Sequence, residues 1–327
     1  MAMTIFSIIS CEDWLDVNAS TELDRNELFK TEDGYGEALI GVYVGMCDAS
    51  LYGRELTFDI VDMLGSYYNI TSYNHVNWYK YNYGDPTNSF AINYCAAYID
   101  DIWNKIYAQI ANINSLLEAI DGDKNVFSDD NYSLIKGEAL GLRAYLHFDL
   151  VRLFGEAYSL GKDKECIPYV TKLSSLVNPL FTQDDAIEMI LEDLKEAKKL
   201  LENDPMHLGT SPSGCLASLP SGTYLSSDNI PVWHNRRFRF NYYAAIATMA
   251  RVYLWKGDRT NALICAKEVI EDRESKFPWV LGQNLTYVGN TSNTRYRNQD
   301  RSFATEHIFA LNLTNLESLM DSYIYMG

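Results

Sequence analysis

The sequence has few basic residues, and no long apolar run follows residue 11. Its 27 Lys and Arg stand against 44 Asp and Glu, a formal net charge of −17. Such a chain repels phosphate backbones and offers no polybasic stripe to anionic lipid, so we expect no nucleic-acid partner. No stretch beyond residue 11 approaches the roughly 20 apolar residues of a membrane-spanning helix. Any membrane attachment is therefore expected at the N-terminal end.

The usual signatures of catalytic and metal sites are also missing. The 6 cysteines form no CxxC pair, and the 5 histidines are scattered without an HExxH motif. The sequence contains neither a glycine-rich phosphate loop nor a GxSxG motif. Acidic residues are plentiful, but sequence spacing does not show the carboxylate separation of roughly 5 to 10 Å that glycoside hydrolysis needs. We expect no enzyme activity, no metal and no cofactor.

The N-terminal stretch is typical of a processing signal. Residues 2–10, AMTIFSIIS, carry no charge, and Cys11 follows them directly, with Glu12 and Asp13 behind. The run has the length of the apolar region of a secretory signal, although the basic residues that usually precede it are absent. Residues 8–10 loosely resemble a lipobox, in which the next cysteine becomes lipidated. The alternative is that the run lies in an ordinary first strand.

Helical periodicity dominates the rest of the chain, whose 47% hydrophobic content supports a substantial core. Apolar residues recur every three or four positions over 31–48, about 90–121, 131–155 and 182–205. The third segment is the strongest; its apolar face consists of Ile135, Ala139, Leu142, Leu146, Leu150 and Leu153. Leu142 and Leu146 are predicted core residues, and His147 on the same helix is predicted to be packed. Thr182 with Asp185 indicates a capped helix start.

Residues 241–273 indicate two closely packed helices. Small residues recur on both, and Gly257 with Asp258 makes the turn between them. The unit is close to the roughly 34-residue tetratricopeptide period, without its Trp and Pro markers. We predict a mostly α fold of degenerate tetratricopeptide-like helical hairpins with long irregular loops and few short strands. The best strand signal is 306–313, EHIFALNL.

Three long interruptions, 49–89, 205–240 and 274–305, are more typical of function than of packing. Residues 67–83, YYNITSYNHVNWYKYNY, hold seven aromatic residues in seventeen, interleaved with asparagines. Sugars need this mixture, because aromatic rings pack on the apolar faces of pyranoses while amides and carboxylates fix the hydroxyls. The alternative is that these rings anchor the loop to the helices beneath, and we expect about half to do so.

The candidate glycan-binding residues follow from this stretch and its upstream neighbour. They are Trp78, Tyr79, Tyr81, Asn82, Tyr83 and Asp62. Trp78 is the expected stacking platform, because Trp has the largest flat face. Arg54, Asp59 and Asp62 either bind sugar hydroxyls or form a structural ion pair. Trp279 and Tyr287 make a second aromatic group.

Five segments in this order resemble one family. They are a cysteine followed by EDWLDV, the aromatic excursion, GEALGLRAYLHFDLVRLFG, ARVYLWKGDRTNALICAKEVI and TEHIFALNL. Over about 11–315 the sequence is similar to the SusD-like (RagB/SusD) lipoproteins of Bacteroidetes. The most specific segment is the one that contains Glu138, Arg143, Tyr145 and Phe148. We interpret 1–11 as the remnant of a signal and lipobox, and 12–327 as a single α-helical SusD-like domain without the family's C-terminal lobe.

The resemblance implies a cell-surface, outer-membrane lipoprotein. Such proteins capture oligo- or polysaccharide for import through a SusC-like, TonB-dependent transporter. The resemblance also implies that Cys11 carries the lipid and that Glu12 and Asp13 act in surface export. The alternative function, from another class, is a helical-repeat scaffold that binds a protein partner and no sugar.

We predict that Cys11 is the lipid anchor. Each buried methylene contributes about 0.8 kcal/mol, so two or three acyl chains hold a protein stably on a membrane. In a Bacteroidetes host, a version of the gene with a complete signal should incorporate radiolabelled palmitate, and the Cys11→Ala variant should not. Equal labelling of the two proteins would contradict the prediction.

Overall fold

Helices make up most of the regular structure in the computed structural model, which describes residues 25–67, 78, 89–122, 124–174, 176–209, 236–281, 303–316 and 318. The strands among these residues are β1 (Glu165–Ile167) and β2 (Phe181–Thr182), which pair antiparallel with Glu165 opposite Thr182. The predicted fold class, mostly α with few short strands, is confirmed. In the described part of the chain, no helix is both long and apolar enough to cross a membrane.

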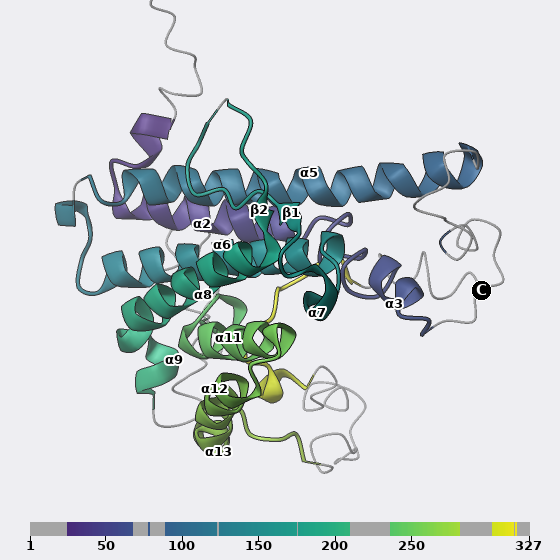
Figure 1. Cartoon of the computed structure of the whole chain (residues 1–327). Helices are drawn as coiled ribbons and strands as arrows, with labels where there is room; N and C mark the ends of the chain where they lie inside the picture. The colour runs from purple at the N-terminus through teal and green to yellow at the C-terminus, as the bar shows by residue number, and fades with distance from the viewer. Residues whose placement is uncertain are drawn as a thin grey trace, which may run out of the picture.

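The longer helices form a stack (Figure 1). They are α2 (Glu32–Met46), α5 (Ser89–Ala119), α6 (Asn131–Phe154), α8 (Gln183–Leu200), α11 (Tyr242–Lys256) and α12 (Arg259–Glu271). α5 packs on α2 and α6, α6 packs on α8, α8 on α11 and α11 on α12. The short helices are α3 (Ile60–Leu64), α7 (Tyr158–Gly161), α9 (Pro205–Leu208) and α13 (Arg273–Lys276). Single 3₁₀ turns span Lys124–Val126, Leu201–Asn203, Arg236–Phe238 and Ala304–Glu306.

The predicted segments match these helices to within a few residues, and local capping explains where they begin. The Thr31 and Thr182 side chains accept hydrogen bonds from the amides of Gly34 and Asp185, at the starts of α2 and α8. Gly257 has a φ of +84°, a left-handed conformation that lets the chain turn from α11 into α12. The fourth segment is shorter than predicted, because α8 ends at Leu200 before a 3₁₀ turn.

α6 is the central helix of the fold. Leu142 and Leu146 are both 0% exposed, which confirms them as core residues. The helix is also buried on its polar side, where its central charged residues lie, so it is enclosed rather than amphipathic. A side chain at Gly141 would place its Cβ 2.1 Å from the Phe240 ring, so glycine permits the close approach of the segment before α11.

His147 is packed, as predicted. The Val170 amide donates to Nε2 over 3.0 Å, so Nδ1 carries the proton and donates to the Arg143 carbonyl oxygen over 2.8 Å. Tyr169 stacks on the ring at 4.0 Å. Burial lowers the pKa of His147 to about 3, so the ring is neutral near pH 7.

The predicted strand at 306–313 is wrong. This segment begins in the 3₁₀ turn Ala304–Glu306 and continues as irregular chain. Two of its attachments run to the segment that precedes α11: the Ala310 amide donates to the Arg237 carbonyl oxygen over 3.1 Å, and the Asn241 side chain donates to the Ile308 carbonyl oxygen over 2.7 Å. The alternating apolar residues therefore pack on the helices rather than in a sheet.

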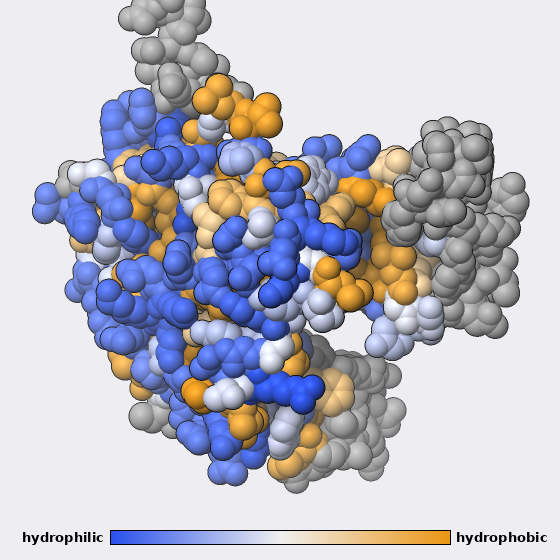
Figure 2. All heavy atoms as spheres, in the orientation of Figure 1, coloured by the Kyte–Doolittle hydropathy of each residue, from blue (hydrophilic) through white to orange (hydrophobic). Residues whose placement is uncertain are grey.

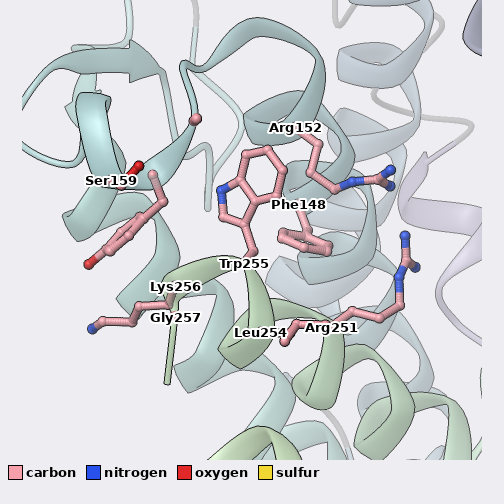
Figure 3. A pocket seen from close by; sticks show the side chains of 10 residues that line it. Phe148, Arg152, Ser159, Arg251, Leu254, Trp255, Lys256 and Gly257 are labelled. Carbon is pink, nitrogen blue, oxygen red and sulfur yellow. The ribbon is translucent and has the colours of Figure 1, made fainter. Parts of the chain in front are cut away.

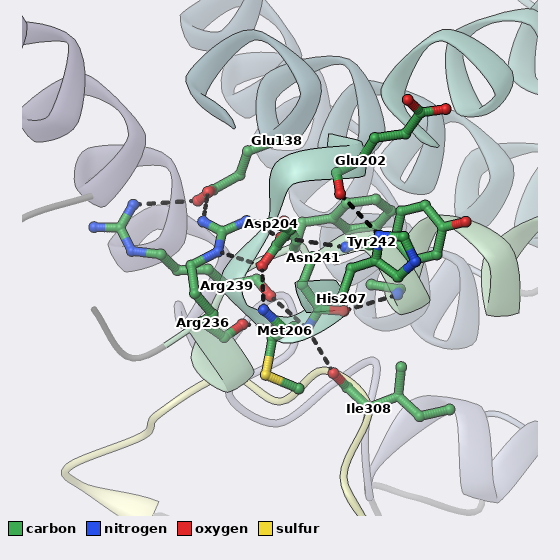
Figure 4. Close-up of polar contacts among 12 residues, drawn as sticks. Glu138, Glu202, Asp204, Met206, His207, Arg236, Arg239, Asn241, Tyr242 and Ile308 are labelled. Carbon is green, nitrogen blue, oxygen red and sulfur yellow. Dashed lines mark hydrogen bonds and ion pairs between the residues drawn. The ribbon is translucent and has the colours of Figure 1, made fainter. Parts of the chain in front are cut away.

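A buried ion network joins elements that lie far apart in sequence (Figure 4). Arg236 is 0% exposed and its guanidinium lies between the carboxylates of Glu138 on α6 and Asp204 at the start of α9. Tyr43 of α2 and Arg239 donate to the other Glu138 oxygen over 2.6 Å and 3.2 Å. Burial lowers the pKa of Arg236, but the two carboxylates outweigh burial and raise it above the ordinary value.

We predict that Arg236→Met destabilises the fold by about 3–5 kcal/mol, because the change leaves buried carboxylates without their partner. Urea unfolding measures this loss. Arg259→Met, at an exposed position on α12, is the matched control and should change stability by no more than about 0.5 kcal/mol. An Arg236→Met protein within about 1 kcal/mol of wild type would show that the network does not hold the fold together.

Candidate functional site

The segment between α2 and α3 contains the polar residues that were predicted beside the aromatic stretch. Arg54 Nε donates to Glu55 Oε1 over 2.8 Å and lies 3.5 Å from Asp59 Oδ2. Glu55 is 1% exposed and Asp59 is 8% exposed. The structural ion pair, one of the two interpretations of Arg54 and Asp59, is therefore present. Its charges are directed into the protein and not toward a ligand.

Glu55 has an unusual environment for an acid. Burial and the neighbouring Asp59 carboxylate raise its pKa to about 7, while Arg54 opposes the shift. Its second oxygen, Oε2, is buried without a hydrogen-bond partner. Nearby, the Tyr52 hydroxyl donates to Asp149 on α6 over 2.7 Å. The Tyr52 contact fastens the segment to the central helix, which positions α3.

Trp78 is packed in the structure. It is 5% exposed, and its ring meets the edge of Tyr98 on α5 at a centroid distance of 6.1 Å. Tyr94, one turn earlier on α5, extends the aromatic contact at 5.2 Å from Tyr98. The open platform expected at Trp78 is not present in this conformation, because a sugar can stack only on an uncovered ring face.

The structure describes only some of the other predicted site residues. Asp62 is half-buried on α3. Tyr67, the first ring of the aromatic stretch, is 79% exposed. Tyr79, Tyr81, Asn82 and Tyr83, the asparagines at 69, 74 and 77, and the predicted lipid anchor Cys11 lie outside the described residues.

Trp279, from the second aromatic group, has an available ring. It is 60% exposed, and the Arg273 guanidinium lies 5.1 Å from its ring centroid. Val280, the next residue, is attached to the 3₁₀ turn Ala304–Glu306, because its amide donates to a Glu306 side-chain oxygen over 2.7 Å. A ring with one cation nearby and most of its surface in solvent is a suitable platform for stacking. Tyr287, its predicted companion, lies outside the described residues.

Sequence reasoning missed the aromatic residues of α5 that support Trp78. Tyr94 and Tyr98 stand four positions apart, so they share one helix face, and this spacing was the available signal. Nothing in the sequence links that face to residue 78. Within the described ranges, no group of three or more His, Cys, Asp or Glu side chains could hold a metal ion.

Solved structures from two Bacteroides proteins show the same fold. A SusD-like carbohydrate binding protein from Bacteroides vulgatus superposes with a TM-score of 0.59 at 15% identity, covering 90% of this chain and 54% of its own. A putative sugar binding protein from the same species gives 0.52 at 23% identity, covering 75% of this chain and 47% of its own.

Curated relatives and a family description agree with this fold. SusD-like protein P25 of Formosa agariphila is 26% identical over 47% of this chain and 29% of its own length. SusD-like protein P2 of the same organism is 24% identical over 68% of this chain, so the chain spans less than half of either relative. Residues 13–225 match the SusD-like family described as "Starch-binding associating with outer membrane". This match extends over more than half of the sequence, and the chain therefore belongs to the SusD-like family.

Proposed function

We propose that this chain binds oligo- or polysaccharide at the cell surface and delivers it for import. The observation that carries the proposal is the match of residues 13–225 to a family described as starch-binding and associated with the outer membrane. The name of the Bacteroides vulgatus neighbour, a SusD-like carbohydrate binding protein, agrees with it. The proposed role is binding, with no catalysis.

The proposed site lies on the loops beside the helical stack. Exposed rings at Tyr67 and Trp279 offer stacking faces, and Asp62 offers a carboxylate for sugar hydroxyls. We propose Tyr79, Tyr81, Asn82 and Tyr83 as further contacts, from their residue types. Trp78 belongs to the same stretch, and it contacts sugar only if its packed ring is uncovered.

The proposed partner is a SusC-like, TonB-dependent transporter, and the proposed anchor is a lipid on Cys11. Apolar side chains on the outer face of α12 support a protein contact there, because Leu263, Ile264 and Ile270 are 55%, 58% and 63% exposed. Figure 2 shows several apolar patches on a surface that is otherwise hydrophilic, and Leu160, Leu176 and Val177 are also exposed. The scaffold alternative uses the same helices but leaves the aromatic loops without a role, and we do not favour it.

A glycan array tests the proposal. The purified chain should bind a restricted set of glycans and leave the others unbound, because exposed rings and fixed polar groups select by shape. The same array probed with the Trp279→Ala protein is the matched control and should give weaker signals on the same glycans. A folded chain that binds no glycan would contradict the proposed function.

Substituting two tryptophans separates packing from sugar stacking. Trp78→Ala should lower the free energy of unfolding by about 3–5 kcal/mol, because the ring is buried. Trp279→Ala should leave stability nearly unchanged and weaken glycan affinity by roughly 5- to 150-fold, by analogy with base–aromatic stacking at about 1–3 kcal/mol per ring. Urea unfolding and calorimetric titration with the best array glycan measure the two effects. If the Trp78→Ala protein is as stable as wild type, the Trp78 ring is not packed, and Trp78 again becomes a candidate stacking platform.

A further inference from the structure

A pocket of about 480 Å³ opens where the C-terminal ends of α6 and α11 meet α7 (Figure 3). Its wall is aromatic: Phe148 of α6 and Trp255 of α11 meet edge to face at a centroid distance of 6.5 Å. Two arginines, Arg152 and Arg251, line it from the same two helices. Their side chains are 42% and 44% exposed, so both guanidinium groups are accessible to a ligand.

The arginine side of the pocket has an excess of positive charge. Arg152 Nη1 lies 2.9 Å from Asp149 Oδ1, and Arg251 Nη2 lies 3.9 Å from the same oxygen. The other Asp149 oxygen accepts a hydrogen bond from Tyr52 over 2.7 Å. Two cations thus share one carboxylate, in a chain whose formal net charge is −17. Figure 3 shows both guanidinium groups on the same side of Trp255.

The opposite side of the pocket is neutral or acidic. The Lys256 ammonium pairs with Glu188 and lies 3.4 Å from Asp184, so its charge is already compensated. The indole nitrogen of Trp255 points away from the arginines and in the direction of Ser159 (Figure 3). That nitrogen is buried without a hydrogen-bond partner, although an indole N–H usually finds one. The pocket therefore combines a ring face and a hydroxyl with one excess positive charge on its arginine side.

We propose that this pocket binds an acidic sugar residue, one that carries a single carboxylate or sulfate ester. The apolar face of the pyranose would pack on the Trp255 indole. The anionic group would lie between Arg152 and Arg251, because guanidinium groups bind planar or tetrahedral oxyanions through paired N–H donors. Ser159, which is exposed, would bind a hydroxyl. This inference rests on the proposed glycan-binding function and specifies one class of ligand for it.

Calorimetric titration of the full chain at low salt tests the proposal with two matched pairs of probes. The first pair is tetragalacturonate and its methyl ester, which is neutral. The second is a κ-carrageenan tetrasaccharide and its desulfated form. In at least one pair, wild type should bind the acidic member about tenfold more tightly or better, because a charge-assisted hydrogen bond is stronger than a neutral one. The pair that shows the preference distinguishes carboxylate from sulfate.

The variants locate the preference in the pocket. Arg152→Gln/Arg251→Gln should bring the two affinities to within about twofold, whereas Lys199→Gln/Arg259→Gln, the same loss of two positive charges at exposed positions on α8 and α12, should keep the preference. Trp255→Phe, which keeps a ring but reduces the flat face for stacking, should weaken both members of the pair equally. Thermal unfolding confirms that each variant is folded.

Two results would overturn this proposal. One is that wild type binds the acidic and the neutral member of each pair with equal affinity, or binds none of the four probes. The other is a preference for the acid that survives in the double arginine variant. A chain that binds neutral glycans on the array but shows either result contradicts this proposal alone, whereas a folded chain that binds no glycan at all contradicts the proposed function.

Discussion

The ion pair between Glu138 and Arg236 is the interaction on which the rest of the described structure depends. Both side chains are 0% exposed, and burying either charge would be costly without a partner of opposite sign. Asp204 completes the charge balance and also caps α9, since it accepts a hydrogen bond from the Met206 amide over 2.8 Å. The network therefore fixes how α6, α9 and the segment before α11 meet. Replacing it with apolar side chains could preserve stability, but the polar geometry selects one arrangement of these elements.

Because the helices of the stack are packed against one another, we expect ligand to bind at the loops and helix ends. α6 is enclosed by its neighbours, so its central polar side chains serve the interior: Arg143 forms an ion pair with Asp193 at 2.7 Å, and His147 is hydrogen-bonded on both ring nitrogens. The accessible aromatic and cationic groups lie at the edges, at Trp279 and at the end of α6. The rigid core thus supports loops that can differ in specificity among relatives of the same fold.

Periodicity and capping predicted most of the helices, because both are local properties. Thr182 and Gly257 perform the roles that their residue types indicate. The sequence does not determine structure where tertiary contacts decide. Residues 306–313 alternate like a strand but pack on helices, and Trp78 lies in a stretch typical of sugar binding but packs against Tyr98 of α5. Arg152 and Arg251 lie on different helices, so no spacing in the sequence could bring them together.

The central claim is that sugar binds at the loops and helix ends rather than along the paired helices. Hydrogen exchange of the amides, with and without the best array glycan, tests it most directly. We expect slower exchange over residues 52–83, 273–287 or the pocket between α6, α7 and α11, and unchanged exchange in α8 and α12. Slower exchange confined to α8 and α12 would contradict the account and identify the helical hairpins as the binding surface.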